Sequence, residues 1–383
     1  MNINFSELIS FTAFNSFWDY LTAAYLVIFV IQLLFYFGVF ARVAFFKQKE
    51  EKKANQEPVS VIICARNERD NLLEFLPRYF SQNYTQYEII VVNDGSFDDS
   101  QDVLKAFALQ HKNLKIVTVP DTDRFFGSKK FALTLGIKAA QYEQVLLTDA
   151  DCYPLSDNWI VEMSAYSNTK KIILGVGNYR KEKGLLNRLI RFETFYTAIQ
   201  YLGFAIAKMP YMGVGRNLAY HQELFFKNKG FASHQHILSG DDDLFINEVA
   251  TSKNVQVVLT ENSQTISTPK TSYKMWIRQK KRHFTTGKHY RFKHQLMLGL
   301  LQLSQMLFFT LFIVLLINVR PVYLIVGVFV FRYLIQMLIF KLSANKIGGK
   351  DLVLLAPFFE IFFMLFNPIL VISNLLIKKV KWN

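Results

Sequence analysis

The sequence VLLTDAD, residues 145–151, is a short apolar run that ends abruptly on two carboxylates, Asp149 and Asp151. Such a run, bounded by polar residues, is typical of a strand buried in a sheet. The two acids would then lie where the strand ends, which is where ligands collect in open α/β sheets. Two carboxylates at this spacing can hold a divalent cation, and the cation can hold a diphosphate. Taken alone, the pattern also fits a solvated loop that carries two acids.

Strand and helix patterns alternate on both sides of this run. Apolar, β-rich runs predict further strands at 59–64, 88–92, 114–119, 172–176 and 255–260, with helical stretches among them. This alternation predicts a parallel, doubly wound α/β sheet. Polar clusters follow three of the strand ends, which is the arrangement of a nucleotide pocket.

The composition indicates a membrane protein that carries a soluble domain. Of the 383 residues, 51% are hydrophobic and only 19% are charged, which is too apolar for an ordinary soluble protein of this length. The net charge of +14 fits nucleic acid, anionic lipid or a phosphorylated substrate as a partner. Much of the basic charge flanks apolar segments or falls within 270–293. This distribution favours the membrane surface and phosphates, and it predicts no nucleic-acid partner.

Four apolar segments have the length of a membrane span, at 21–41, 296–318, 322–340 and 352–377. Lysines and arginines follow the first segment, so the positive-inside rule places that flank in the cytoplasm and the N-terminus outside. Because a basic n-region and a cleavage site are missing, the first segment is predicted to be an uncleaved anchor.

Two of these segments carry charged side chains. Arg332 lies within the third, and a charge at that depth usually faces protein or water. The fourth contains Glu360 and two prolines and is followed by three lysines. A single crossing would place those lysines outside, whereas a re-entrant or kinked hairpin would keep them inside. The sequence favours neither alternative.

Three other stretches have more than one interpretation. Residues 204–214 are apolar but too short to span, so they form either core or an interfacial helix that admits a lipid-borne substrate. The basic and aromatic stretch 270–293 predicts an amphipathic helix on anionic lipid, and some of its bases can also grip a diphosphate. Lys129 and Lys130 open a helix, where phosphate binding is possible, but we expect them to be solvated.

Several motifs then follow one another along the chain: Arg66-Asn67-Glu68, Asn93-Asp94-Gly95-Ser96, Asp149-Ala150-Asp151, Gly240-Asp241-Asp242 and Gln279-Lys280-Lys281-Arg282-His283. Together they resemble a membrane-anchored family 2 glycosyltransferase of the GT-A fold, over residues 59 to 284. The resemblance implies a doubly wound mixed sheet with transmembrane helices before and after it. His283 stands where processive synthases of cellulose, chitin and hyaluronan carry Trp, which argues against processivity.

The resemblance also implies a role for each motif. The expected donor-binding residues are Arg66, Asn67, Glu68, Asp94, Asp149, Gln279 and Arg282; the expected ligands of Mg²⁺ or Mn²⁺ are Asp151 and Asp149; and the expected catalytic base is Asp242. A metal ion and cationic side chains would stabilise the leaving diphosphate, and a carboxylate would take the acceptor's proton. The adjacent acids at 241–243 would raise one another's pKa, although helix capping also explains them.

The sequence therefore predicts an inverting, metal-dependent glycosyltransferase that moves a sugar from a nucleotide-sugar, with UDP expected, to a lipid or lipid-linked acceptor. The expected units are an N-terminal anchor at 1–46, a cytoplasmic catalytic domain at 57–268, a basic interfacial segment at 269–294 and a C-terminal transmembrane region at 295–383. The expected location is the cell (inner) membrane, as a multi-pass protein. The alternatives are a processive polysaccharide synthase and a non-catalytic membrane scaffold.

Overall fold

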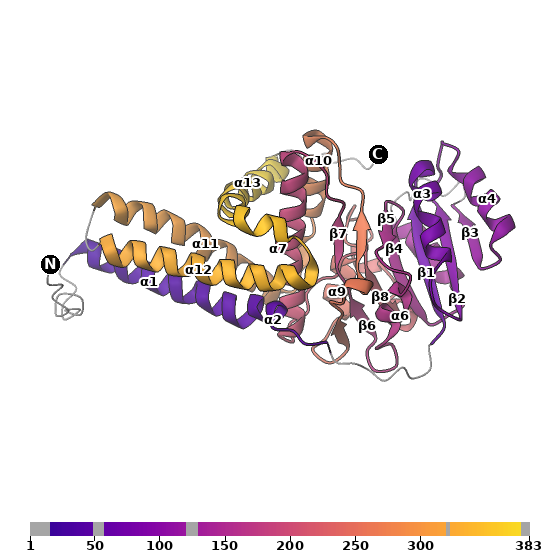
Figure 1. The fold of residues 1–383 in the computed structure, drawn as a ribbon, viewed down its shortest axis with the longest axis horizontal. Helices are drawn as coiled ribbons and strands as arrows, with labels where there is room; N and C mark the ends of the chain where they lie inside the picture. The colour runs from indigo at the N-terminus through magenta and orange to yellow at the C-terminus, as the bar shows by residue number, and fades with distance from the viewer. Residues whose placement is uncertain (1–15, 49–56, 120–128, 319–321, 377–383) are drawn as a thin grey trace.

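The computed structural model describes residues 16–48, 57–119, 129–318 and 322–376. Figure 1 shows an α/β domain from which the long helices α1, α11 and α12 project together to one side. The 22-residue helix α7 (Leu185–Ile206) stands across the inner end of this bundle, between it and the sheet. The chain thus has two parts, and α7 lies at the junction between them.

The bundle is built from long apolar helices. Helix α1 (Phe17–Phe35) continues through a π-helical turn (Tyr36–Phe40) into α2 (Ala41–Ala44), and α11 (Phe292–Asn318) and α12 (Val322–Ile347) pack beside it. With Lys350–Asn374, these make four helices in the described residues that are long and apolar enough to cross a membrane. All four predicted apolar segments are therefore helical.

The fourth segment forms a 3₁₀ turn (Lys350–Leu355) followed by a single helix, α13 (Ala356–Leu376). Of the two alternatives that the sequence left open, the hairpin is excluded, because α13 continues through Pro368 without a reversal. In Figure 1, α13 lies across the direction of α1, α11 and α12, next to α7. It packs on α10 (Tyr273–His283), where Trp276 stacks on Phe366 with ring centroids 5.2 Å apart. The lysines that follow it lie outside the described residues.

Seven strands form the main sheet of the described domain, in the order β3-β2-β1-β4-β8-β6-β9. Their bounds are Leu114–Thr118, Tyr87–Asn93, Val59–Ala65, Gln144–Asp149, Leu218–His221, Ile172–Leu174 and Val255–Val257. The first four run parallel, but β8 is antiparallel to both β4 and β6. The parallel arrangement expected from the alternation therefore holds for the first four strands, and the mixed sheet implied by the family resemblance is confirmed.

The central strands β1, β2 and β4 are buried on both faces, which explains their continuous apolar runs. Ile62 and Leu147 pack on one face, in a core that α5 (Lys129–Ala139) and α7 share with the membrane-length helices. Val61 and Leu146, the preceding residues in each strand, pack on the other face. Helices α3 (Arg69–Phe80), α4 (Ser100–Gln110) and α6 (Trp159–Ser164) cover that face.

The structure decides how two stretches with more than one interpretation, 204–214 and 270–293, are folded. Only 204–206 of the stretch 204–214 is helical, at the end of α7, and much of the remainder is buried, so the core interpretation is right and the interfacial helix is wrong. The stretch 270–293 is not one helix, because α10 ends at His283 and a 3₁₀ turn (Gly287–His289) precedes α11. Arg332 is fully buried and pairs with Glu360 of α13, as expected for a charge that faces protein.

The remaining elements complete the domain beside the main sheet. A small sheet of β5 (Cys152–Pro154), β10 (Thr265–Ser267) and β7 (Gly177–Tyr179) continues directly from the two acids that follow β4. Helices α8 (Gln222–Lys227) and α9 (Asp243–Val249) follow β8. The start of α9 brings the acids at 241–243 toward the same end of the sheet.

Candidate active site

The carboxyl ends of β1, β2 and β4 meet at one edge of the sheet and open on a cavity of about 400 Å³. The predicted donor-site and metal-site residues that line it are Arg66, Asn67, Glu68, Asp94, Asp149, Asp151, Gln279 and Arg282. They come from three strand ends and from helix α10, which is more than 100 residues further along the chain. The structure therefore brings every predicted residue except Asp242 to this one cavity.

Two turns at the cavity rim are bonded to each other. Asn67 has a left-handed backbone (φ 56°), its N–H donates to Ser96 Oγ (3.0 Å), and its Oδ1 accepts from the N–H of Phe97 (2.8 Å). Gly95 also has a positive φ (62°), a conformation that favours glycine. These bonds hold Arg66 and Glu68 beside Asp94, where the loops after β1 and β2 meet.

Asp149 and Asp151 offer carboxylate oxygens that lie, with Cys152 Sγ, within 4.8 Å of one another. Burial raises the pKa of the Cys152 thiol well above its usual range, so it stays protonated and packs against Ser267. Burial and the neighbouring Asp149 also raise the pKa of Asp151. Two hard oxygen donors in a partly open position fit Mg²⁺ or Mn²⁺.

A second cavity of about 440 Å³ adjoins the first and is lined by Asp241, Asp242 and Asp243. Lys129, Asp149, Asp151, Gln279 and Arg282 line both cavities. The predicted base Asp242 therefore lies across a shared wall from the predicted metal ligands.

Lys129 stands at this wall. Its Nζ lies 2.8 Å from Asp149 Oδ1 and 2.8 Å from Asp241 Oδ2, so one ammonium joins the two acidic motifs. Burial works against the charge, but the carboxylates raise the pKa of Lys129 well above its usual range. Lys129 therefore stays cationic, and the expectation of a solvated lysine is wrong.

Asp242 is held by two backbone N–H groups. Its Oδ2 accepts from Gly215 (2.7 Å) and its Oδ1 accepts from Asp243 at the start of α9 (2.7 Å). Burial, with the charges of Asp241 and Asp243, raises the pKa of Asp242 to about 7. A carboxyl with this pKa exchanges a proton near neutral pH, which is what a general base requires.

The other two acids have structural partners. Asp243 accepts hydrogen bonds from Thr286 Oγ1 (2.5 Å) and from Tyr290 OH (2.7 Å), which fasten α9 to the chain after α10. Burial acts to raise the pKa of Asp241, but the Lys129 ammonium and its hydrogen bond lower it overall. Among the described residues, Asp242 is thus the one of the three acids whose carboxylate is held by backbone N–H groups alone, and it also caps α9.

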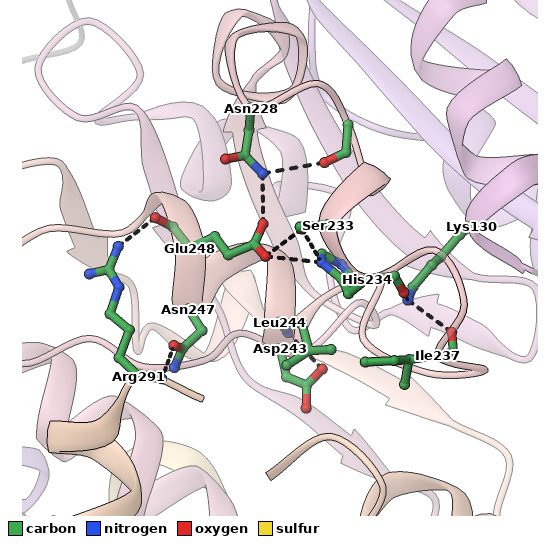
Figure 2. Close-up of polar contacts among 11 residues, drawn as sticks. Lys130, Asn228, Ser233, His234, Ile237, Asp243, Leu244, Asn247, Glu248 and Arg291 are labelled. Carbon is green, nitrogen blue, oxygen red and sulfur yellow. Dashed lines mark hydrogen bonds and ion pairs between the residues drawn. The ribbon is translucent and has the colours of Figure 1, made fainter. Parts of the chain in front are cut away.

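Lys130 holds the loop that leads into the acids (Figure 2). Its buried Nζ donates to the carbonyl oxygens of His234 (2.7 Å) and Ile237 (3.0 Å). The His234 ring contacts Glu248 of α9 (3.1 Å). Both lysines therefore position the acids at 241–243. Lys129 pairs with the Asp241 carboxylate, and Lys130 holds the backbone of the loop that precedes these acids.

The sequence analysis did not assign four groups that the structure places at the site, namely Lys129, Lys130, the Gly215 N–H and Arg216. Arg216 lines the second cavity and stacks over Tyr179, with its guanidinium carbon 4.4 Å from the ring centroid. A lysine pair just after a glycine at a predicted helix start was the available signal for the first two. For the other two, the Gly-rich turn at residues 213–217 predicted that backbone approaches a ligand there, but not that the Gly215 N–H holds Asp242.

Comparisons with known proteins agree with this geometry. Residues 60–226 match the family model of glycosyl transferase family 2. A poly-beta-1,6-N-acetyl-D-glucosamine synthase of Staphylococcus epidermidis is 29% identical over 139 residues, which is 36% of this chain and 32% of that one. Glycosyltransferase GlyG of Streptococcus pneumoniae is 28% identical over 123 residues, or 32% of this chain and 39% of that one. The chain thus spans about a third of the length of these relatives.

Among solved structures, a mannosyltransferase from Pyrobaculum calidifontis, in complex with GDP-mannose and Mn²⁺, superposes with a TM-score of 0.56. The match covers 91% of this chain and 98% of that one at 18% identity, so it concerns the fold alone. The family model, the relatives and the mixed sheet lead to one conclusion. Residues 60–226, within the α/β part of this chain, match glycosyl transferase family 2, and this part has the GT-A fold.

Proposed function

We propose that the protein is an inverting glycosyltransferase that moves a sugar from a nucleotide-diphospho-sugar, a UDP-sugar by expectation, to a lipid or lipid-linked acceptor. The observation that carries this proposal is the wall shared by the two cavities. It places Lys129, Asp149 and Asp151 between the donor cavity and Asp242. A donor on one side and an acceptor on the other would meet there.

On the donor side, Asp94 and the Arg66–Glu68 turn hold the nucleoside, while Gln279 and Arg282 contact the diphosphate. Asp149 and Asp151 would hold Mg²⁺ or Mn²⁺. Such a metal stabilises the charge that develops on the leaving diphosphate. The Mn²⁺ bound by the Pyrobaculum calidifontis enzyme, which shares the fold, supports a divalent ion.

On the acceptor side, Asp242 takes the proton of the attacking hydroxyl, and the two N–H groups keep its carboxylate in place. We assign no carboxylate as a covalent nucleophile, so the reaction is one displacement that inverts the anomeric carbon. Intact acids at positions 94, 149, 151 and 242 argue against a non-catalytic scaffold.

The membrane assignment rests on the four apolar helices and on basic residues beside them. We propose a multi-pass protein of the inner membrane with its catalytic domain, residues 57–268, on the cytoplasmic side. The other proposed units of the chain are an N-terminal anchor at 1–46, a basic segment at 269–294 and the C-terminal helices at 295–383. The alternative is processive polysaccharide synthesis, because polysaccharide synthases are among the relatives. A ladder of long products would support this alternative.

Asp151→Ala is expected to abolish metal-dependent donor binding, because half of the carboxylate pair is lost. The measurement is a thermal-shift screen of nucleotide-sugars with Mn²⁺, followed by titration of the best donor. Asp102→Ala, an exposed acid on α4, is the matched control and should bind like the wild type. Equal Mn²⁺-dependent shifts in Asp151→Ala and the wild type would contradict the metal assignment.

Lys129→Met is expected to slow transfer and to move the acid limb of its pH profile upward. The Lys129 charge lowers the pKa of Asp242, so its removal raises that pKa and keeps the base protonated to a higher pH. Lys129→Arg preserves the charge and should restore the limb toward its original position. A profile that does not move in Lys129→Met would show that Lys129 and Asp242 are not electrostatically linked.

A further inference from the structure

The second cavity does not end at the acids. It extends from Asp242 past α7 to side chains of the membrane-length helices, Gln302 and Gln305 on α11 and Asn367 on α13. About 440 Å³ is a normal volume for a small-ligand site. We call the part between α7, α11 and α13 the deep end.

The deep end contains polar groups with unused hydrogen-bonding capacity. Gln302 Nε2 and Asn367 Oδ1 are buried and have no hydrogen-bond partner among the described residues. Gln305 Nε2 donates to Tyr196 OH (2.5 Å), so another amide and a phenol lie in the same wall. Buried amides are normally satisfied, and an unsatisfied pair on two helices indicates a ligand that completes them.

The chemistry of these groups limits the ligand. An acyl or polyprenyl chain has no group that could bond to the amides. A phosphate would seek a cation, but the two lysines that line this cavity are already paired, Lys280 with Glu193 of α7 and Lys129 with two carboxylates. Of the two lining arginines, Arg216 stacks over Tyr179, and Arg282 is the one assigned to the donor. A glycosyl unit offers hydroxyls that both donate and accept, and aromatic side chains such as Trp276 and Tyr201 line the same cavity.

We propose that the deep end binds an uncharged glycosyl unit of the acceptor, so that the enzyme adds its sugar to a saccharide that is already present. This inference rests on the proposed function, because it takes Asp242 as the base that faces the attacking hydroxyl. Gln302 and Asn367 would hold the unit beyond that hydroxyl from two different helices.

The test uses the full chain in nanodiscs of phosphatidylcholine and phosphatidylglycerol, purified without sugar-based detergents, since these detergents are themselves glycosides. The acceptor probes are octyl β-glycosides of glucose, N-acetylglucosamine, galactose and mannose, compared with a polyprenyl phosphate. Transfer of radiolabelled sugar is measured with the donor found by the thermal-shift screen. Donor affinity is measured separately, without an acceptor.

We expect at least one glycoside to accept sugar. Gln302→Leu and Asn367→Leu should each raise its half-saturating concentration about tenfold, with donor affinity unchanged. Thr310→Val, an exposed polar position on α11, should change it by less than about twofold. Because the two variants lie on separate helices, a folding defect in one would not explain the same result in the other. Unchanged donor affinity shows that each variant is folded.

Transfer to the polyprenyl phosphate and to none of the glycosides would overturn the inference while leaving the proposed function intact. Equal half-saturating concentrations for wild type and both variants would overturn it as well. If no nucleotide-sugar binds the wild type, the proposed function fails and the inference fails with it.

Discussion

Asp242→Asn is expected to lower the rate of sugar transfer by about 10²–10⁴-fold, the usual contribution of a general base. The amide keeps the size of the side chain and can still accept from the N–H of Gly215 or Asp243, so the fold is retained. Donor binding should be nearly unchanged, because Asp242 does not line the donor cavity. The measurement is the transfer rate at saturating donor, beside the donor affinity.

The pH profile gives a second check on the same residue. Burial with Asp241 and Asp243 raises the pKa of Asp242 to about 7, and only the deprotonated carboxylate can take a proton. The rate should therefore fall below about pH 7 and level off above it. Asp102→Asn, at an exposed position of α4, is the control and should keep the wild-type profile. A full rate in Asp242→Asn, or a flat profile between pH 6 and 8 in the wild type, would contradict the assignment of the base.

Removing one member of the Arg332–Glu360 pair is expected to destabilise the helical part by about 3–5 kcal/mol, because the remaining charge stays buried without its partner. Both side chains are almost fully buried and pair directly between α12 and α13. Gln336 donates to Glu360 Oε2 (3.0 Å), and Arg332 donates to Gln32 Oε1 of α1 (3.1 Å). The pair thus binds three helices together.

The test is a double-mutant cycle. Arg332→Met and Glu360→Met should each lower the unfolding temperature in nanodiscs, whereas the double variant should recover most of the loss, since it leaves neither charge buried. Lys341→Met, at an exposed position of α12, controls for losing a charge on that helix. Losses that simply add in the double variant would show that the two groups do not interact.

Much of the fold was predictable because it depends on local patterns. Continuous apolar runs predicted β1, β2 and β4, since strands covered on both faces need apolar residues at every position. The β8 strand was missed because its four residues, Leu218–His221, are too few for a period, and its antiparallel direction depends on the path of the chain through α7. The course of α13 was also unpredictable, because Pro368 permits either a kink or a continuous helix.

The site was predictable where a motif sits at a strand end. Asp94 and Asp149 follow β-rich runs, and parallel strands in one sheet bring their carboxyl ends to one edge. The Gly-rich turn at 213–217 predicted a close approach of backbone to a ligand, but the contact from the Gly215 N–H to Asp242 was not predictable, because it is defined by position in space and not by residue type. The deep end was equally hidden, because Gln302 and Asn367 look like isolated polar residues within apolar helices.

The sequence by itself determined the elements, the membrane-length helices and the motifs, because these follow from the hydrophobic period and from the residue types that a chemistry requires. Only the tertiary structure decided how the motifs face one another. Lys129 joins Asp149 to Asp241 although 92 residues separate the two acids, as their numbers in the sequence show. Such a contact depends on the packing of whole helices and strands, which no local pattern encodes.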